Sequence, residues 1–458
     1  MMATPETSLL VDDQTPADLV SEFAAWFTAN TSYRTRVIHF NETGLLTVSE
    51  KPEVIISLLK GTQNYPQSLN GLILEVDSPN YLDSLRKGIL PDNLHSETTL
   101  IIQLNQVFNG VRTEVSSGRF RLTNYAGTRN AQQIFYQVLI LIKETLDRIS
   151  NGSFKPLSSL PVIPDNKLKS DTKISHYLNT LFSVYKWNIG IIHQPIHEVA
   201  FSSKRLDVEW LDEAPGNDFR ADPFGYIHMG NEYLLYEYYD YKRKKGYLRK
   251  RDESGDHFYM ESPSHLSYPY IFQAQGRLYL TPESAAAGTI NLYSIDNNIP
   301  TAKHGVLEAE AVDPTIFHYN NQWWLFFTDK KRQGADLKLH IYFSPYPEGP
   351  WHPHANNPVK TDICTARPGG TPFMHNGKLY RPVQDSSGGY GSALFIMEIT
   401  KLTTEIFEEI PVNRITPDML TGPYKEGVHT LSPLGNKTLI DAKRKKRTLQ
   451  PFLHYIVK

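Results

Sequence analysis

The chain has little cysteine, almost no net charge and no long apolar run. Among its 458 residues the one cysteine, Cys364, excludes an intrachain disulfide and a zinc site built on several cysteines. Its 47 basic and 49 acidic residues give a net charge of −2. This balance provides no electrostatic basis for binding nucleic acid or an anionic membrane. No segment approaches the length of a transmembrane helix.

The N-terminal residues 1–15 carry acidic side chains and lack a basic stretch followed by an apolar core. We therefore expect no signal peptide and no transmembrane segment, with a cytoplasmic location as the default. The glycine-rich residues 388–391 lack the strand-to-helix context of a phosphate-binding loop. The motifs predict neither a cofactor nor a bound metal.

Aromatic residues are abundant, and they recur in a pattern. The 26 tyrosines and an aromatic share of 12% favour β structure and surfaces that face sugars. Residues 221–237 and 312–329 nearly repeat each other: each begins with Asp-Pro, at Asp222 and Asp313. Apolar residues then follow with a period of two on both sides of a polar turn. Each segment therefore predicts two antiparallel strands joined by a tight turn.

Three further segments copy this unit, at residues 266–283, 366–382 and 427–441. Five units at intervals of roughly 45 to 60 residues fit a propeller with one four-stranded blade per repeat. The apolar residues 187–192 are expected to form a strand that closes the ring against the last blade. We predict a five-bladed β-propeller over residues 180–458.

The first part of the chain follows another pattern. Residues 18–30 and 131–149 have a helical period, and strands are predicted near 35–40, 71–76 and 98–104. Strands that alternate with helices indicate a small α/β accessory domain over residues 1–170. The predicted fold class is therefore mainly β, a five-bladed propeller preceded by a small α/β domain.

Several short motifs occur in a fixed order along the repeats. They are Ala-Asp-Pro-Phe (221–224), His-Leu-Ser-Tyr-Pro (265–269), Pro-Glu-Ser (282–284), Val-Asp-Pro-Thr (312–315), Trp-Trp-Leu-Phe (323–326), Ala-Arg-Pro-Gly-Gly (366–370), Tyr-Arg-Pro-Val-Gln-Asp (380–385), Tyr-Gly (390–391) and His-Thr-Leu (429–431). With these motifs the repeats resemble the propeller domain at the N-terminus of plant glucosamine inositolphosphorylceramide transferases and of related bacterial proteins. The glycosyltransferase module of the plant enzymes has no visible counterpart here.

That domain is in turn similar to the five-bladed propellers of furanose-active glycosidases, such as arabinanases and β-xylosidases, which carry Asp-Pro in blades one and three. Residues 70–150 weakly resemble the downstream half of a formyltransferase-like domain that is often joined to such propellers. The Asn, His and Asp set which that family uses for formyl transfer has no motif match. We therefore expect a degenerate domain without a formyl-transfer site.

In a propeller the innermost strands line the central channel, so the residues at their heads converge at one mouth. Asp222 and Asp313 are expected there, together with His265, Glu283, Arg367 and His429. Two separated carboxyl groups are what glycosidic cleavage requires. Separations of roughly 6.5–9.5 Å indicate inversion, and roughly 5–5.5 Å indicate retention.

The glycosidase resemblance implies that Asp222 is the general base. It implies that Asp313 orients the substrate and raises the pKa of the acid. In those enzymes the acid is a Glu at the head of the fourth blade, where this chain has Arg367. Glu283 is the best substitute, with Asp385 next. An arginine at the axis suits an anionic ligand such as a carboxylated sugar, a phosphate or a sulfate.

Structural roles compete with each of these interpretations. Asp-Pro at the start of a strand often serves as a turn or cap, and Glu283 could end a hairpin. Arg367 could pair with Asp313 or Asp385. His265 and His429 could be hydrogen-bonded core imidazoles, or a hydrated divalent ion could lie beside one of them. The expected substrate-binding residues are Arg367, His265, Gln384, Asp385, Tyr390 and His429.

The leading hypothesis is a carbohydrate-active protein that cleaves or transfers a glycosidic bond of a glycoside or glycoconjugate at the propeller mouth. Its ligand would be a carbohydrate or a glycolipid head group, with an acidic or phosphorylated sugar as one variant. Two alternatives stay open: a non-catalytic glycan- or glycolipid-binding module, and an accessory partner of a separately encoded glycosyltransferase.

Overall fold

The computed structural model describes residues 6–12, 17–31, 34–40, 54–58, 72–76, 99–108, 111–121, 127–150, 157, 160–161, 163, 182–331 and 335–448. The chain divides into two compact units. The first comprises Met1–Leu160 and Pro164–Ser170, and the second comprises Pro161–Ile163 and Asp171–Lys458.

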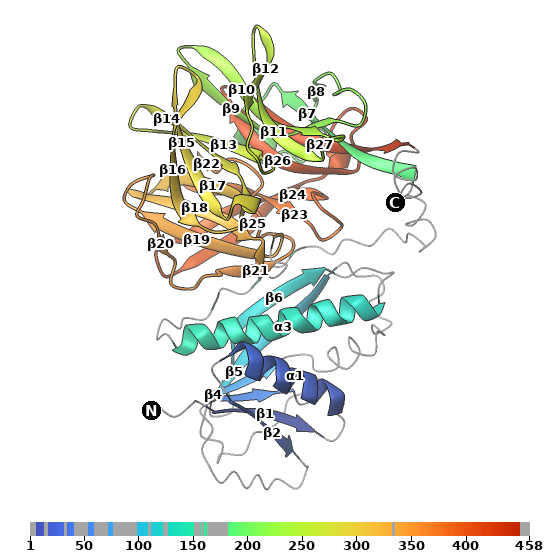
Figure 1. Ribbon diagram of the computed structural model, residues 1–458, viewed down its shortest axis with the longest axis vertical. Coiled ribbons are helices and arrows are strands. Elements are labelled where there is room, and N and C mark those ends of the chain that lie inside the picture. Colours follow the sequence, from blue (N-terminus) through green and yellow to red (C-terminus); the bar gives the residue numbers. More distant parts are fainter. Residues whose placement is uncertain are drawn as a thin grey trace. The chain divides into compact units, whose positions relative to one another are not determined.

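The first unit combines a sheet with two helices, α1 (Ala17–Asn30) and α3 (Gly127–Ser150), which lie on one face of it (Figure 1). Its first four strands are parallel in the order β2-β1-β3-β4, and an antiparallel hairpin, β5-β6, continues the sheet from β4. These strands are β1 (Glu6–Asp12), β2 (Arg34–Phe40), β3 (Val54–Ser57), β4 (Leu72–Val76), β5 (Thr99–Phe108) and β6 (Val111–Arg121). Within the described residues, neither helix nor any other is long and apolar enough to span a bilayer.

The second unit is mainly β and has a propeller-like arrangement with four separate four-stranded sheets. Three are antiparallel meanders in chain order: β9 (Phe219–His228), β10 (Asn231–Asp240), β11 (Lys245–Asp252) and β12 (Gly255–Met260); β13 (Ser267–Ala274), β14 (Arg277–Glu283), β15 (Thr289–Asp296) and β16 (Ile299–Glu308); β22 (Phe373–His375), β23 (Lys378–Asp385), β24 (Ala393–Leu402) and β25 (Phe407–Ile415). Between the second and third of them along the chain, β17 (Ala311–Tyr319), β18 (Gln322–Asp329) and β19 (Lys338–Ser344) form another meander. The short strands β20 (His352–Pro353) and β21 (Lys360–Asp362) both pair with β19.

The fourth four-stranded sheet joins the two ends of this unit. The C-terminal strands β26 (Gly427–Leu434) and β27 (Lys437–Arg447) continue through β7 (Ser183–Ile192) to β8 (Glu209–Trp210) (Figure 1). Ile440 pairs with Gly190 in the ladder between β27 and β7. The strand expected at residues 187–192 therefore forms and closes the last sheet, as predicted.

Each of the strands β9, β13, β17 and β26 contains one extra residue near its start. Two residues of the first strand oppose one of the second there, for example between the pairs Ala221–Glu237 and Phe224–Leu235. Asp222, Tyr268 and Asp313 lie in these bulges with φ values of 53°, 43° and 51°. A proline follows each of them, and because it lacks an N–H it suits a point where the ladder is interrupted. The repeated Asp-Pro motif thus marks a bulge that re-aims the side chain.

Apolar side chains of neighbouring sheets pack against each other and form the core. One cluster joins the sheets of β9, β13 and β17 through buried residues that include Phe224, Tyr270, Leu280 and Leu325. Another joins the sheets of β17 and β22 through Trp324, Phe326 and Leu379. Because these contacts fix each sheet against the next, the bulges are held at defined positions.

Candidate functional site

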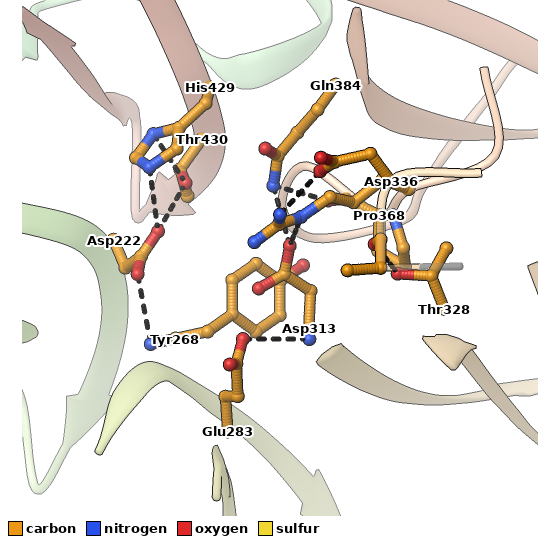
Figure 2. A network of polar contacts seen from close by, with 12 residues as sticks. Asp222, Tyr268, Glu283, Asp313, Thr328, Asp336, Pro368, Gln384, His429 and Thr430 are labelled. Carbon is orange, nitrogen blue, oxygen red and sulfur yellow. Dashed lines mark hydrogen bonds and ion pairs between the residues drawn. The ribbon is translucent and has the colours of Figure 1, made fainter. Parts of the chain in front are cut away.

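A cavity of about 310 Å³ lies beside the bulges. Residues from all five repeated segments contribute to its wall, so the predicted convergence takes place for most of the expected residues. Its lining comprises Trp187, Phe219, Ala221, Asp222, Glu237, Tyr239, His265, Ser267, Glu283, Val312, Lys330, Ala335, Arg367, Tyr390 and His429. Figure 2 shows the polar network that holds part of this wall in place.

Asp222 is 4% exposed, and both of its carboxylate oxygens accept hydrogen bonds. The Thr430 hydroxyl donates to Oδ1 at 2.9 Å, and the Tyr268 N–H donates to Oδ2 at 3.1 Å (Figure 2). Burial raises the pKa of Asp222 to about 6, the carboxylates of Asp441 and Asp313 act in the same direction, and His429 opposes them. At neutral pH most of this side chain is therefore ionised, yet it is basic enough to accept a proton.

His429 lies between two carboxylates. Its Nδ1 is 2.7 Å from Oδ1 of Asp441, and its Nε2 is 3.5 Å from Oδ1 of Asp222. Burial alone would lower the pKa of His429, but the two carboxylates outweigh it and the pKa is raised. The ring also stacks on Trp187 at a centroid distance of 4.0 Å. These contacts favour an imidazolium that is held rigidly beside Asp222.

Asp441 was not among the residues predicted for the site, although it shapes Asp222 directly. It is fully buried, and its Oδ2 accepts the backbone N–H of Asp222 at 2.8 Å. Its Oδ1 also accepts the N–H of Thr430 at 3.0 Å. Asp441 therefore fixes the bulge at Asp222 from a strand that is more than two hundred residues away in the chain.

The Asp222, His429 and Asp441 side chains bring oxygen and nitrogen atoms within 4.8 Å of one another, the spacing of a metal site. Their chemistry does not suit one. The carboxylate oxygens already accept N–H and O–H groups, and the raised pKa of His429 favours the imidazolium, which has no lone pair to offer a cation. We assign this cluster no metal.

Arg367 and Asp313 form a buried ion pair, with Nε 2.6 Å from Oδ2. Gln384 donates from Nε2 to the same oxygen at 2.6 Å, and Arg367 binds Asp336 with Nη1 at 2.6 Å (Figure 2). Arg367 lines the cavity, whereas Asp313 and Gln384 are not among the described residues that do. The sequence left open a structural role for Arg367, in which it pairs with Asp313, and this pairing is present in the structure.

Glu283 and Glu237 both face the cavity and have raised pKa values. Oε2 of Glu283 accepts the N–H of Asp313 at 3.2 Å. Burial raises the pKa of Glu283 well above its usual value, Asp313 adds to this, and Arg367 opposes it. For Glu237, which is 6% exposed, burial and then the carboxylates of Asp222 and Glu283 raise the pKa well above its usual value. Two glutamic acids whose pKa values are raised therefore share the cavity with Asp222.

The other predicted residues lie in different environments. Tyr390 is 42% exposed, lines the cavity and lies 5.0 Å from the Arg367 guanidinium. His265 is half-buried and accepts the Gly246 N–H at Nδ1. Asp385 is 1% exposed and is not among the described residues that line the cavity. Its carboxylate accepts hydrogen bonds from Ser387 and Arg414, not from Arg367.

A signal for Glu237 was present in the sequence. Glu237 and Glu283 occupy the same place in two of the repeated hairpins, since they pair with Ala221 and Ser267, each directly before a bulge residue. From the sequence, Glu283 is predicted as a candidate acid, and Glu237 is not. Asp441 carried no such signal, because its pairing position differs from that of the two glutamates.

Residues 208–424 match the family described as "Glucosamine inositolphosphorylceramide transferase 1, N-terminal". The resemblance indicated by the sequence motifs is therefore confirmed for this segment. Proteins named glucosamine inositolphosphorylceramide transferase 1 from rice (Oryza sativa subsp. japonica) and from Arabidopsis thaliana are each 33% identical over 211 residues, which is 43% of this chain. The match spans 28% of the rice protein and 27% of the Arabidopsis protein.

Solved structures with some likeness are glycosidases. The catalytic domain of a Coprinopsis cinerea α-L-arabinofuranosidase is 11% identical, with a TM-score of 0.35 over 49% of this chain and 90% of that domain. A Bacillus subtilis arabinanase is 13% identical, with a TM-score of 0.31 over 48% of this chain and 92% of its own. These similarities are too low to transfer a residue role.

Proposed function

We propose that this protein binds a carbohydrate or glycoconjugate in the 310 Å³ cavity and cleaves or transfers a glycosidic bond there. The observation that carries the proposal is the meeting of three carboxyl groups, those of Asp222, Glu237 and Glu283, in one cavity whose wall also contains aromatic rings. Carboxyl groups supply acid and base, and aromatic faces suit the apolar faces of sugars.

In this proposal Asp222 is the general base, because its pKa of about 6 leaves it ionised at neutral pH. A protonated glutamic acid of the same cavity, Glu237 or Glu283, would protonate the departing oxygen. Asp313 would act indirectly, because its charge helps to raise the pKa of Glu283 and its carboxylate holds Arg367 in the wall. In this proposal water or an acceptor hydroxyl attacks the sugar carbon directly.

The charges of the cavity favour a neutral or amino sugar over an acidic one. Arg367 is already paired with Asp313 and Asp336, so its positive charge is largely compensated. Lys330 and His429 are the other cationic side chains of the lining, and His429 is already paired with Asp441 and Asp222. The rice and Arabidopsis relatives are named for glucosamine, which carries an amino group. An acidic or phosphorylated sugar would have to bind through the remaining donors of Arg367 and through Lys330.

A glycan-binding module without turnover is the second candidate. It is favoured by the Arg at the head of the fourth repeat, where the glycosidases that the sequence resembles carry their acid. Such a module could also serve a separately encoded glycosyltransferase as an accessory partner, and co-purification of the two would support that role. We further infer that β17–β21 form a fifth blade, which would complete the ring that the five hairpins imply.

A binding screen followed by a turnover assay tests the proposal. Thermal shift against glucosamine, N-acetylglucosamine, arabinofuranosides and glucuronic acid identifies the sugar class, because a ligand that binds the folded state raises the Tm. Turnover of the corresponding 4-nitrophenyl glycosides is then measured. Binding with turnover supports the enzyme, and binding without turnover supports the binding module. If the protein shows neither binding nor turnover with any of these sugars, the proposal is contradicted.

A further inference from the structure

Glu237 and Glu283 are equivalent by position but not by contact. Each lies opposite the residue before a bulge, Ala221 or Ser267. Glu283 accepts the N–H of the bulge residue of the following repeat, Asp313, at 3.2 Å. It is therefore tied to the backbone of the neighbouring sheet.

The corresponding donor for Glu237 would be the N–H of Tyr268, the bulge residue of the next repeat. That N–H donates instead to Oδ2 of Asp222, at 3.1 Å (Figure 2). Asp222 thus takes over the structural contact that Glu283 makes in its own repeat. Glu237 is left in the cavity wall without a backbone partner among the described residues.

The polar contact that Glu237 does make is with His265, whose Nε2 lies 3.3 Å from Oε1. The Nδ1 of the same ring accepts the Gly246 N–H at 2.8 Å, so the proton of the neutral ring belongs on Nε2, the nitrogen nearer Glu237. Burial and then Lys330 and Lys245 lower the pKa of His265, which keeps the ring neutral.

Gly246 makes this arrangement possible. A Cβ atom at this position would lie 2.4 Å from Oε1 of Glu237 and 2.6 Å from Cε1 of His265. Both distances are far below van der Waals contact, so a larger residue would separate the pair. The backbone of β11 is thus shaped around the contact between a glutamic acid and a histidine.

Carboxyl groups surround Glu237, and the cationic side chains Arg367, Lys330 and His429 line the same cavity. Asp222 on β9, Glu283 on β14, Asp313 on β17 and Asp441 on β27 all raise its pKa, after burial. The facing His265, from the segment before β13, is neutral. The leading causes of the raised pKa of Glu237 are burial and these carboxyl groups, whereas Arg367 opposes the raised pKa of Glu283.

We propose that Glu237 is the proton donor of this cavity and that His265, which lies against its carboxyl group, is its positioning residue. This rests on the proposed function. As the glycosidic C–O bond breaks, its electron pair goes to the departing oxygen, which takes the proton from the carboxyl group of Glu237. Asp222 removes a proton from the attacking hydroxyl, whose oxygen forms the new bond to carbon. Glu237 ends as carboxylate and Asp222 as acid, and exchange with solvent restores both.

The protonation state is tested without any substrate. A carboxyl group whose folded-state pKa is raised contributes stability below its usual pKa of 4.5, and this contribution is lost as the pH rises through the folded pKa. Glu237→Gln stays neutral, so its Tm should exceed that of the wild type by a margin that grows between pH 4.5 and 8. Glu232→Gln, on the same strand but partly exposed beside Lys437, is the control and should show no such trend. A margin for Glu237→Gln that is flat with pH would overturn the proposal.

The donor role is tested with the 4-methoxyphenyl and 2,4-dinitrophenyl glycosides of the sugar that the wild-type protein turns over. A dinitrophenolate leaves without protonation, so loss of the acid should lower kcat/KM for the methoxyphenyl substrate by roughly 100-fold or more and for the dinitrophenyl substrate by less than about tenfold. Glu237→Gln should show this selective loss. If Glu283→Gln shows it instead, Glu283 is the donor and the proposal is wrong.

His265→Gln separates positioning from folding. It should shift the alkaline limb of the pH–rate profile, because the neighbour that holds Oε1 has changed, with a Tm close to that of the wild type. An unchanged profile would contradict the positioning role. If the wild-type protein turns over no glycoside, the proposed function fails, and the pH-dependent Tm still decides whether Glu237 holds a proton.

Discussion

The guanidinium of Arg367 lies against the carboxylate of Asp313, with Nε 2.6 Å from Oδ2, at the head of two different repeats. The sequence suggested that this arginine could hold an anionic ligand. In the folded protein its charge is instead paired with Asp313 and with Asp336, and both contacts lie in the wall of the candidate site. The ion pair therefore stabilises the wall of the candidate site, and Arg367 has only its remaining donors to offer a ligand.

Replacing Arg367 with methionine should destabilise the protein strongly. Asp313 is 2% exposed and would be left with Gln384 as its side-chain donor, and an uncompensated buried charge costs about 3–5 kcal/mol. Urea denaturation measures the change. Arg243→Met is the matched control, because that arginine forms an exposed pair with Glu261 and should leave the unfolding midpoint unchanged. Equal effects of the two substitutions would contradict the structural role of Arg367.

Asp222→Asn should abolish turnover and preserve the fold. The residue has a φ of 53°, which asparagine tolerates better than most residues, so the bulge can persist while the charge is removed. We expect kcat to fall by at least about 100-fold, the range of a lost general base. Circular dichroism and ligand-induced shifts in Tm check the fold and the binding. A fully active variant would exclude Asp222 as the base.

The pH dependence of turnover should have an acidic limb near pH 6. Burial raises the pKa of Asp222 to about 6, and a general base must be ionised to work. Activity is therefore present above this pH and falls about tenfold for each unit below it. Initial rates between pH 4.5 and 8 on a glycoside substrate provide the measurement. Constant activity down to pH 4.5 would assign the base to another group.

Gly370→Ala should prevent stable folding. Gly370 has a φ of 135°, and a Cβ there would lie 1.9 Å from the carbonyl oxygen of Leu431. The steric clash adds to the strain of a positive φ for alanine. We therefore expect the free energy of unfolding to fall by at least about 3 kcal/mol. Gly377→Ala, at a turn with a φ of 75° and open space around it, should cost only about 1 kcal/mol. Soluble yield and urea denaturation compare the two, and similar stabilities would show that the backbone can shift at Gly370.

Much of the candidate site was predictable from local patterns. Period-two alternation and polar turns located the hairpins, and their recurrence implied that Asp222, Glu283, Arg367 and His429 meet. Asp385 satisfied the same pattern and yet binds Arg414, because its direction depends on the loop that follows β23. Glu237 was overlooked, although its position repeats that of Glu283.

The amino-acid sequence by itself determined where the strands begin, where they turn and which acidic residues stand near the heads of the repeats, because hydrophobic periodicity and turn chemistry are local properties. Only the tertiary structure decided what each of these acids does. Tyr268 has one N–H, and whether Asp222 or Glu237 accepts it depends on a bulge and on the packing of neighbouring sheets. Such a choice between two equivalent carboxyl groups is made by contacts between residues far apart in the chain, which no local pattern encodes.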